Sequence, residues 1–328
     1  MMMSAAMTTG LIHACLLDGK GGGRILSWDE VQSWSASMGR LWLHFDYTDE
    51  LARDWILNNS ELDALVADAL VSDETRPRAT GIGEGLLIAL RGVNLNPGSD
   101  PDDMVAIRLW VDNERIISTR KRKLLSINDI LSQLEKGKGP ESSAEFIIDL
   151  ADRLVWRMND TVDMLEDEID ELEGRVLSDS SSSVRFDLAA LRKQTIMLRR
   201  YLSPQRDALA RMMIEKVSWI DDTHRMKLRE VSDRLIRHIE NIDAVRERAA
   251  ITQEELISRV SEQLNKRMYV LSVVAAIFLP LGFFTGLLGV NVGGIPGEDN
   301  PKAFLVFMLL LIVVVIFQVL LFRWKKWL

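Results

Sequence analysis

The stretch AFLVFMLLLIVVVIFQVLLF occupies residues 303–322 and contains no charged residue and one polar residue, Gln318. Helical residues rise about 1.5 Å each, so this stretch is about 30 Å long, the thickness of the hydrocarbon core of a bilayer. The alternative is a buried helix in a large soluble core, where helices this long are rarely apolar on every side. The stretch therefore predicts a membrane-spanning helix.

A second uncharged stretch, MYVLSVVAAIFLPLGFFTGLL at residues 268–288, precedes the first. The connecting GVNVGGIPGEDNPK is short and rich in Gly and Pro, which predicts a tight turn and hence a hairpin of two spans. Basic residues flank the outer ends of both spans: Arg259, Lys266, Arg267, Arg323, Lys325 and Lys326. The positive-inside rule then predicts that both chain termini lie in the cytoplasm.

The composition excludes several classes of protein. A net charge of −8 argues against a nucleic-acid partner, because such proteins carry a basic surplus. The single cysteine, Cys15, excludes an intrachain disulfide framework and a Cys-rich zinc cage, and it fits a reducing compartment. No nucleophile–base pair or pair of carboxylates stands out. We therefore predict that the protein is not an enzyme and holds no cofactor.

Residues 1–140 alternate short apolar runs with helical patterns, which predicts an α/β or α+β domain whose strand order the pattern does not give. The expected strands are Leu11–Leu17, Leu41–Phe45, Leu86–Val93, Met104–Val111 and Ile116–Thr119. The expected helices are Glu50–Leu57, Glu61–Val71 with Ser60 as N-cap, and Ile127–Glu135.

Residues 141–267 have only helical signals. We expect one helix over Ala144–Leu177, a second over Val184–Trp219 with a bend near Pro204, and a third from Asp221 with no breaker before Pro280. The third helix would be about 100 Å long, which suits a rod that couples a cytoplasmic domain to a membrane pore. The chain is thus divided into an α/β domain, a long-helix stalk and a transmembrane hairpin over residues 268–328.

The third helix carries a seam of small and polar residues at heptad spacing. One series is Glu254, Ser261, Met268, Ala275, Gly282 and Gly289, and the interleaved series is Ser258, Asn265, Ser272, Leu279 and Gly286. Small or polar groups inside a bilayer favour a side that faces protein or water. Close helix packing through Gly282-x-x-x-Gly286 is one explanation. The other is a water-filled conduit lined by copies of this helix, with Leu279 and Met268 as apolar constrictions.

The continuation of the seam below the membrane favours the conduit, since packing in lipid gives no reason for polar residues there. Two spans cannot enclose a pore, so a conduit requires a symmetric ring of several chains.

Several motifs resemble the two-span hairpin of the CorA superfamily: Leu279-Pro280-Leu281, Gly286, Gly289-Val290-Asn291 and Lys325-Lys326-Trp327-Leu328. The superfamily signature is Gly-Met-Asn, and here Val290 replaces the methionine. Gly-Val-Asn followed by residues 293–297 (GGIPG) is similar to the zinc-transporting ZntB branch. The similarity continues through the soluble part at residues 192–194, 199–201 and 204–207.

This resemblance implies a homopentamer in a bacterial-type inner membrane, with funnel-shaped cytoplasmic domains and a pore lined by the first span. Gly289, Val290 and Asn291 would form the extracytoplasmic mouth. The pore-facing positions that it implies are Asn291, Gly282, Leu279, Ala275, Ser272, Leu271, Met268 and Asn265, and Ser261 and Glu254 extend the same seam. The implied function is zinc transport, by proton-coupled uptake or by efflux. The alternatives are a magnesium or broad divalent-cation channel and a non-conducting membrane-anchored scaffold.

A ring of Asn291 carbonyl oxygens suits a divalent cation bound through its hydration waters. Glu298 and Asp299 in the turn either concentrate cations at the mouth or are solvated loop charges. The acidic run Asp160–Glu173 has the same two interpretations on the cytoplasmic side. Neither span contains a carboxylate to carry a proton, so coupling to H+ rests on the resemblance alone.

Overall fold

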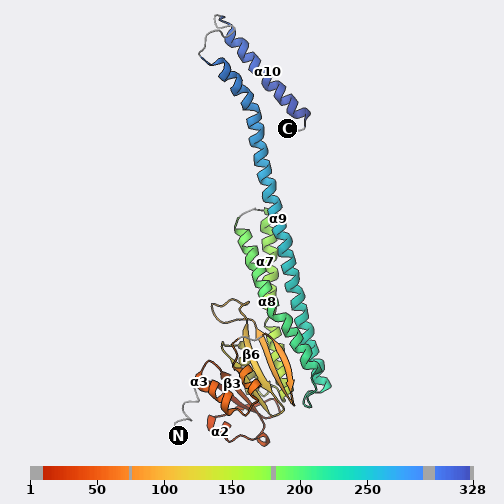
Figure 1. Cartoon of the computed structure of the whole chain (residues 1–328). Helices are drawn as coiled ribbons and strands as arrows, with labels where there is room; N and C mark the ends of the chain where they lie inside the picture. Colours follow the sequence, from red (N-terminus) through yellow and green to blue (C-terminus); the bar gives the residue numbers. More distant parts are fainter. Residues whose placement is uncertain (1–9, 74–75, 179–181, 291–299, 326–328) are drawn as a thin grey trace. The chain divides into compact units, whose positions relative to one another are not determined.

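The computed structural model of the protein describes residues 10–73, 76–178, 182–290 and 300–325 (Figure 1). The chain divides into two compact units, Met1–Gln253 and Glu254–Leu328. The first unit contains a β-sheet, the helices packed on it and a group of long helices, and the second contains the apolar hairpin. An α+β domain followed by long helices and a C-terminal apolar hairpin was predicted, and this fold class is confirmed.

Seven strands in the described part of the chain form one sheet in the order β2-β1-β3-β7-β6-β5-β4. The strands are β1 Leu11–Leu17, β2 Gly23–Ile25, β3 Arg40–Asp46, β4 Arg78–Ile82, β5 Gly85–Gly92, β6 Val105–Val111 and β7 Arg115–Arg120. Strands β3 and β7 run parallel, and the other neighbouring pairs are antiparallel. The parallel pair at the centre of the sheet joins segments about 70 residues apart, which no local pattern reveals.

Helices cover both faces of the sheet. Because successive side chains of a strand point to opposite faces, β3 contributes to two cores at once. Leu41, Leu43 and Phe45 pack in one core with α2 Trp28–Gln32, α3 Glu50–Asp54, η2 Trp55–Asn59 and α4 Ala64–Leu70. Trp42 faces the other side, where its ring lies 4.7 Å from that of Phe146 and its Nε1 donates to Ser118 Oγ at 2.9 Å. Helices α5 Leu125–Glu135 and α6 Ser143–Trp156 cover this second face.

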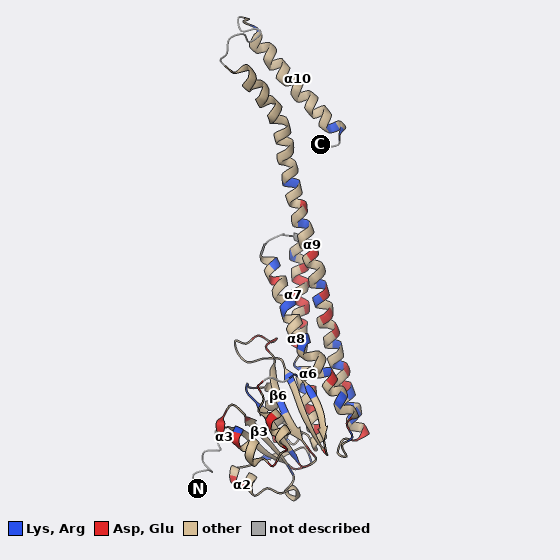
Figure 2. Ribbon diagram, in the orientation of Figure 1, with Lys and Arg blue, Asp and Glu red and all other residues tan. Residues whose placement is uncertain are grey.

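The long helices are α7 Asn159–Ser178, α8 Ser182–Ile214 and α9 Asp222–Leu288, which continues through Pro280. In the first unit their charges pair between helices. The guanidinium of Arg248 donates to Glu173 of α7 at 2.9 and 2.6 Å, and Arg199 of α8 lies 3.1 Å from Asp243 of α9. Figure 2 shows charged residues along these helices, whereas the apolar end of α9 and most of α10 Ala303–Trp324 contain no charged residue.

Three expected helices differ from the structure. The helix expected over Val184–Trp219 is α8, which ends at Ile214. Residues 61–71 were expected to form one helix capped by Ser60, but α4 begins at Ala64 with Asp63 as N-cap, its carboxylate accepting from Leu65 N at 2.8 Å. The Ser60 hydroxyl instead donates to Ile56 O at 2.6 Å, and Glu61 has a φ of 58°, which is incompatible with a helix.

The helix expected over Ala144–Leu177 is two helices, α6 and α7, separated around Arg157. The sequence has no Gly or Pro at this point. The Arg157 guanidinium donates to both carboxylate oxygens of Asp129 in α5, each at 2.8 Å, and Met158 is buried. The interruption is thus held by tertiary contacts rather than by a local breaker. Strands β2 and β4 and helix α2 were also not expected, because each is short.

Candidate functional site in the apolar hairpin

Two helices in the described part of the chain, α9 and α10, are long and apolar enough to cross a membrane. In the second unit, one side of α9 is half-buried, through Val273, Ala276, Ile277, Pro280, Leu281 and Phe284. Ala276 is hydrogen-bonded to α10, and Leu281 lines a hollow shared with α10. On α10, Gln318 and Phe322 are the buried residues. The hairpin therefore has one packed side on its inner surface, and the remaining residues of the apolar part of α9 are exposed.

The predicted seam lies on an unpacked side of α9. A heptad repeat drifts by about 20° per seven residues around a straight α-helix, so the seam members within the membrane span share one side, which borders the half-buried residues. All of them are exposed in the single chain: Glu254, Ser258, Ser261, Asn265, Met268, Leu271, Ser272, Ala275, Leu279, Gly282, Gly286 and Gly289. Leu279 is 73% exposed and Met268 is 65% exposed. A neighbouring chain or water therefore has access to the whole seam.

The polar part of the seam also forms a shallow open hollow. Glu254, Ser258, Ser261 and Asn265 line it together with Ile257 and Glu262. The structure thus brings together the residues that the heptad spacing assigned to one side. Most exposed residues elsewhere on the same span, such as Val274 and Phe278, are apolar, with Thr285 as an exception. What distinguishes the seam is therefore its chemistry.

Ser272 presents an acceptor to its surroundings. Its hydroxyl donates to the Met268 carbonyl, one turn earlier, at 2.8 Å. Because the hydroxyl hydrogen is used within the helix, the lone pairs of the oxygen remain to receive hydrogens of water. An outward acceptor of this kind suits a hydrated cation, whose waters direct their hydrogens away from the ion.

The glycines of the seam differ in what they require. A Cβ at Gly282 or Gly286 would have no heavy atom within 4 Å, so a side chain fits there within the single chain. A Cβ at Gly289 would lie 2.8 Å from the Thr285 carbonyl oxygen, which the end of α9 does not tolerate without a shift. The first residue of the Gly-Val-Asn motif is therefore fixed by local geometry. Val290 is 49% exposed, and Asn291, Glu298 and Asp299 lie outside the described residues.

No group of three or more His, Cys, Asp or Glu side chains with metal-binding geometry occurs among the residues that the structure describes. In the acidic run of α7, Asp170 and Glu173 both accept from Arg248, so part of this run is neutralised. Nearby, the pKa of Glu168 is raised, first by burial and then by the charges of Asp187 and Glu171. Helix α7 therefore contains two carboxylates paired with Arg248, Asp170 and Glu173, and one, Glu168, whose charged form is disfavoured.

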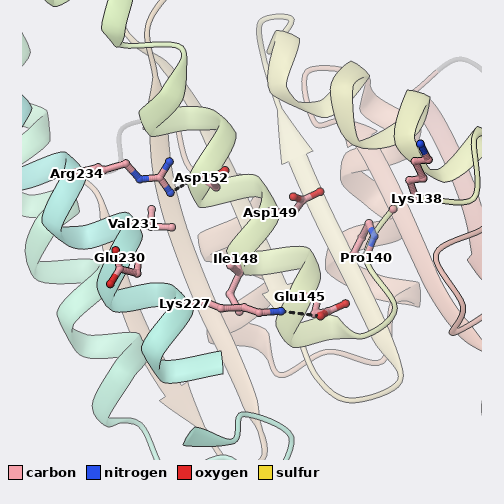
Figure 3. A pocket seen from close by; sticks show the side chains of 11 residues that line it. Lys138, Pro140, Glu145, Ile148, Asp149, Asp152, Lys227, Glu230, Val231 and Arg234 are labelled. Atoms are coloured by element: carbon pink, nitrogen blue, oxygen red, sulfur yellow. Dashed lines mark hydrogen bonds and ion pairs between the residues drawn. The ribbon is translucent and has the colours of Figure 1, made fainter. Parts of the chain in front are cut away.

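A pocket of about 390 Å³ in the first unit combines charges of both signs (Figure 3). Lys227 of α9 points to Glu145 of α6, with 3.0 Å between Nζ and Oε1, and Arg234 pairs with Asp152. The pKa of Glu145 is lowered, first by the backbone N–H of Glu141 and also by Lys227. The contacts in this pocket hold α6 against the first part of α9.

The lone cysteine is chemically protected, which matters for probing the seam. Cys15 in β1 is 1% exposed, and burial, followed by the charge of Asp18, raises the pKa of its thiol to about 11. The reactive thiolate is therefore scarce at neutral pH, and reagents cannot reach it.

We predict that the native chain takes up no charged maleimide at pH 7.5 over the time in which a denatured sample is fully labelled. Mass spectrometry of the intact protein gives the labelled fraction. Rapid labelling of the folded chain would contradict the buried position of this thiol.

Comparisons with known proteins extend over nearly the whole chain. The family model for CorA-like Mg²⁺ transporter proteins matches residues 38–325. The zinc transport protein ZntB of Yersinia pseudotuberculosis is 38% identical over 324 residues, which cover 99% of this chain and 98% of that protein. The divalent cation transporter CmaX of Pseudomonas aeruginosa is 39% identical over 322 residues, 97% of each chain. A solved structure of full-length CmaX is similar with a TM-score of 0.85 at 39% identity, covering 97% of this chain and 98% of that one.

Proposed function

The chain belongs to the CorA-like family of divalent-cation transporters, and from this premise we propose that it carries zinc through a pore formed by several copies of α9. The observation that supports the pore most strongly is the seam, which is mostly small or polar through an apolar span and is left exposed by the single chain. A ring of identical chains turns each seam residue into a ring of identical groups. We propose that five chains form this ring.

Zinc is the proposed ion because the chain resembles the zinc transport protein ZntB along its length, although CmaX is named a divalent cation transporter more broadly. In the proposed mechanism the ion keeps its waters. Asn291 accepts hydrogen bonds from these waters at the mouth, and Ser272 and Asn265 do the same further along the seam. Leu279 and Met268 form narrow apolar rings between these polar positions.

The proposed location is an inner membrane, with both termini in the cytoplasm and Glu298 and Asp299 near the outer mouth. The proposed direction is uptake of zinc together with protons. Since neither span holds a carboxylate, the proton would move through water along the seam or through groups outside the spans.

The full-length chain in proteoliposomes containing a zinc-sensitive dye tests this function. We expect zinc to enter, and to enter faster when the outside is more acidic than the lumen. Equal rates with and without the pH gradient would indicate a channel without coupling, and faster export under the opposite gradient would indicate efflux. Competition by excess Mg²⁺ separates a broad divalent-cation channel from a zinc transporter. If no ion enters under any of these conditions, the non-conducting scaffold is the better description.

A further inference from the structure

Gln318 is the one polar side chain in the apolar stretch of α10, and it is buried at 9% exposure. An amide placed in hydrocarbon without a hydrogen-bond partner is unfavourable by several kcal/mol, about 2 to 7 depending on the reference state. Its Oε1 is buried and has no hydrogen-bond partner among the described residues. Among the described residues, a hydrogen bond that offsets the burial of this amide can therefore involve only its Nε2 atom.

The Nε2 atom of Gln318 donates to the backbone carbonyl of Ala276 in α9 at 3.1 Å. In an α-helix the carbonyl of residue i accepts from the N–H of residue i+4. For Ala276 that residue is Pro280, which has no N–H. The side chain of the outer helix thus supplies the donor that the proline removes from the inner helix. The amide orientation follows from the same contact, because a carbonyl oxygen accepts only from the nitrogen end.

The contact lies on the packed side of α9. Ala276 and Pro280 are half-buried, whereas the seam residues Ser272 and Leu279 are exposed. Both are next to Ala276 on the helix surface, one turn before and one turn after it, and Ser272 lines one hollow with Ala276. A missing hydrogen bond makes a helix easier to bend at a proline. The Gln318 contact therefore lies at the turn of α9 that lacks a backbone hydrogen bond, directly beside the seam.

We propose that Gln318 is a positioning residue that fastens α10 to the unpaired carbonyl at the proline of α9, and so fixes the course of the seam beyond Pro280. The consequence for ion flux rests on the proposed function. The hydrogen bond itself does not depend on it.

A double-mutant cycle in the full-length chain tests this inference. Gln318→Leu removes the donor, and Pro280→Ala returns a backbone N–H to the Ala276 carbonyl. We expect Gln318→Leu alone to lower the apparent Tm of the solubilised protein by about 2 °C and the initial zinc rate per assembled oligomer about threefold, the effect of an average interhelical hydrogen bond in a membrane protein. In the Pro280→Ala background we expect the effect of Gln318→Leu on the Tm and on the zinc rate to be at most half as large as in the native background.

Equal effects of Gln318→Leu in both backgrounds would overturn the inference, because the side chain would then not serve the carbonyl that Pro280 leaves free. If the effect of Gln318→Leu on the Tm depends on the background but its effect on the zinc rate does not, the hydrogen bond exists but does not position the seam. This result would overturn the proposed role of Gln318. Pro280→Leu, which also restores the N–H, provides a second background if Pro280→Ala assembles poorly.

Phe317→Leu is the matched control, since Phe317 is the neighbour of Gln318 and is 64% exposed. We expect it to change the Tm and the zinc rate equally in both backgrounds. If the unmodified chain moves no zinc, the proposed function fails, while the Tm cycle still decides whether the hydrogen bond exists.

Discussion

Replacing Asn291 by alanine is expected to lower the initial rate of zinc transport at least about tenfold, a change equivalent to 1.4 kcal/mol. In the proposed ring each Asn291 side chain accepts a hydrogen bond from the hydration shell of the ion. A hydrogen bond between neutral groups, such as an amide oxygen and a water, contributes about 0.5–1.5 kcal/mol net, so the loss of several around one ion is a large effect. The measurement is dye-reported zinc entry into proteoliposomes at matched protein density.

Asn300→Ala provides the control for this experiment. Asn300 belongs to the same turn, but its Oδ1 accepts from Lys302 N at 2.9 Å, so its role is local. We expect Asn300→Ala to retain most of the zinc rate. If the two asparagine variants transport zinc equally well, the assignment of Asn291 to the mouth of the pore is wrong, and the scaffold alternative gains support.

Gly282→Leu is expected to reduce zinc flux by a similar factor, about tenfold or more, with the oligomer intact, because it adds an apolar ring to the seam. The single chain accepts this side chain, since a Cβ at Gly282 meets no heavy atom within 4 Å. Leucine also has a higher helix propensity than glycine, which is about 0.8–1 kcal/mol less favourable than alanine. Gly282 also lines a hollow between α9 and α10, so the leucine can extend into that hollow as well as into the seam.

This variant separates the two explanations of the seam. If Gly282-x-x-x-Gly286 served close helix packing, the leucine would separate the chains, and size-exclusion chromatography would show smaller assemblies. If the seam lines water, the oligomer keeps its size and the flux falls. Val274→Leu, on an exposed apolar side of the same span, is the control and should change neither.

The hairpin was predictable because its signals are local. Twenty uncharged residues, a short turn with Gly and Pro, and basic flanks such as Arg267 and Arg323 each bear directly on the bilayer. The seam remains a prediction: heptad spacing in a continuous helix assigns Ser272 and Leu279 to one side without reference to the rest of the protein, and α9 is continuous over these residues. The central strands of the sheet likewise followed from their apolar runs.

The features that sequence reasoning missed depend on contacts between distant segments. The parallel pairing of β3 with β7 and the interruption of the helix at Arg157, held by Asp129, have no local signature. The pairing of Gln318 with Ala276 was also missed. A signal for it existed: Pro280 leaves a carbonyl without a donor, and the neighbouring span contains a single side chain able to supply one. Combining these two facts would have suggested the contact.

The central claim is that the seam of α9 faces water in the assembled protein. Ser272→Cys tests it most directly, because the native thiol of Cys15 is buried and the introduced thiol is then the one reagents can reach. We predict that a charged, water-soluble thiol reagent labels this variant in the intact membrane and blocks zinc flux, while Val274→Cys in the same turn stays unlabelled. The contradicting result would be a Ser272→Cys variant that stays unlabelled in the intact membrane although its introduced thiol reacts after denaturation. The seam would then not face water.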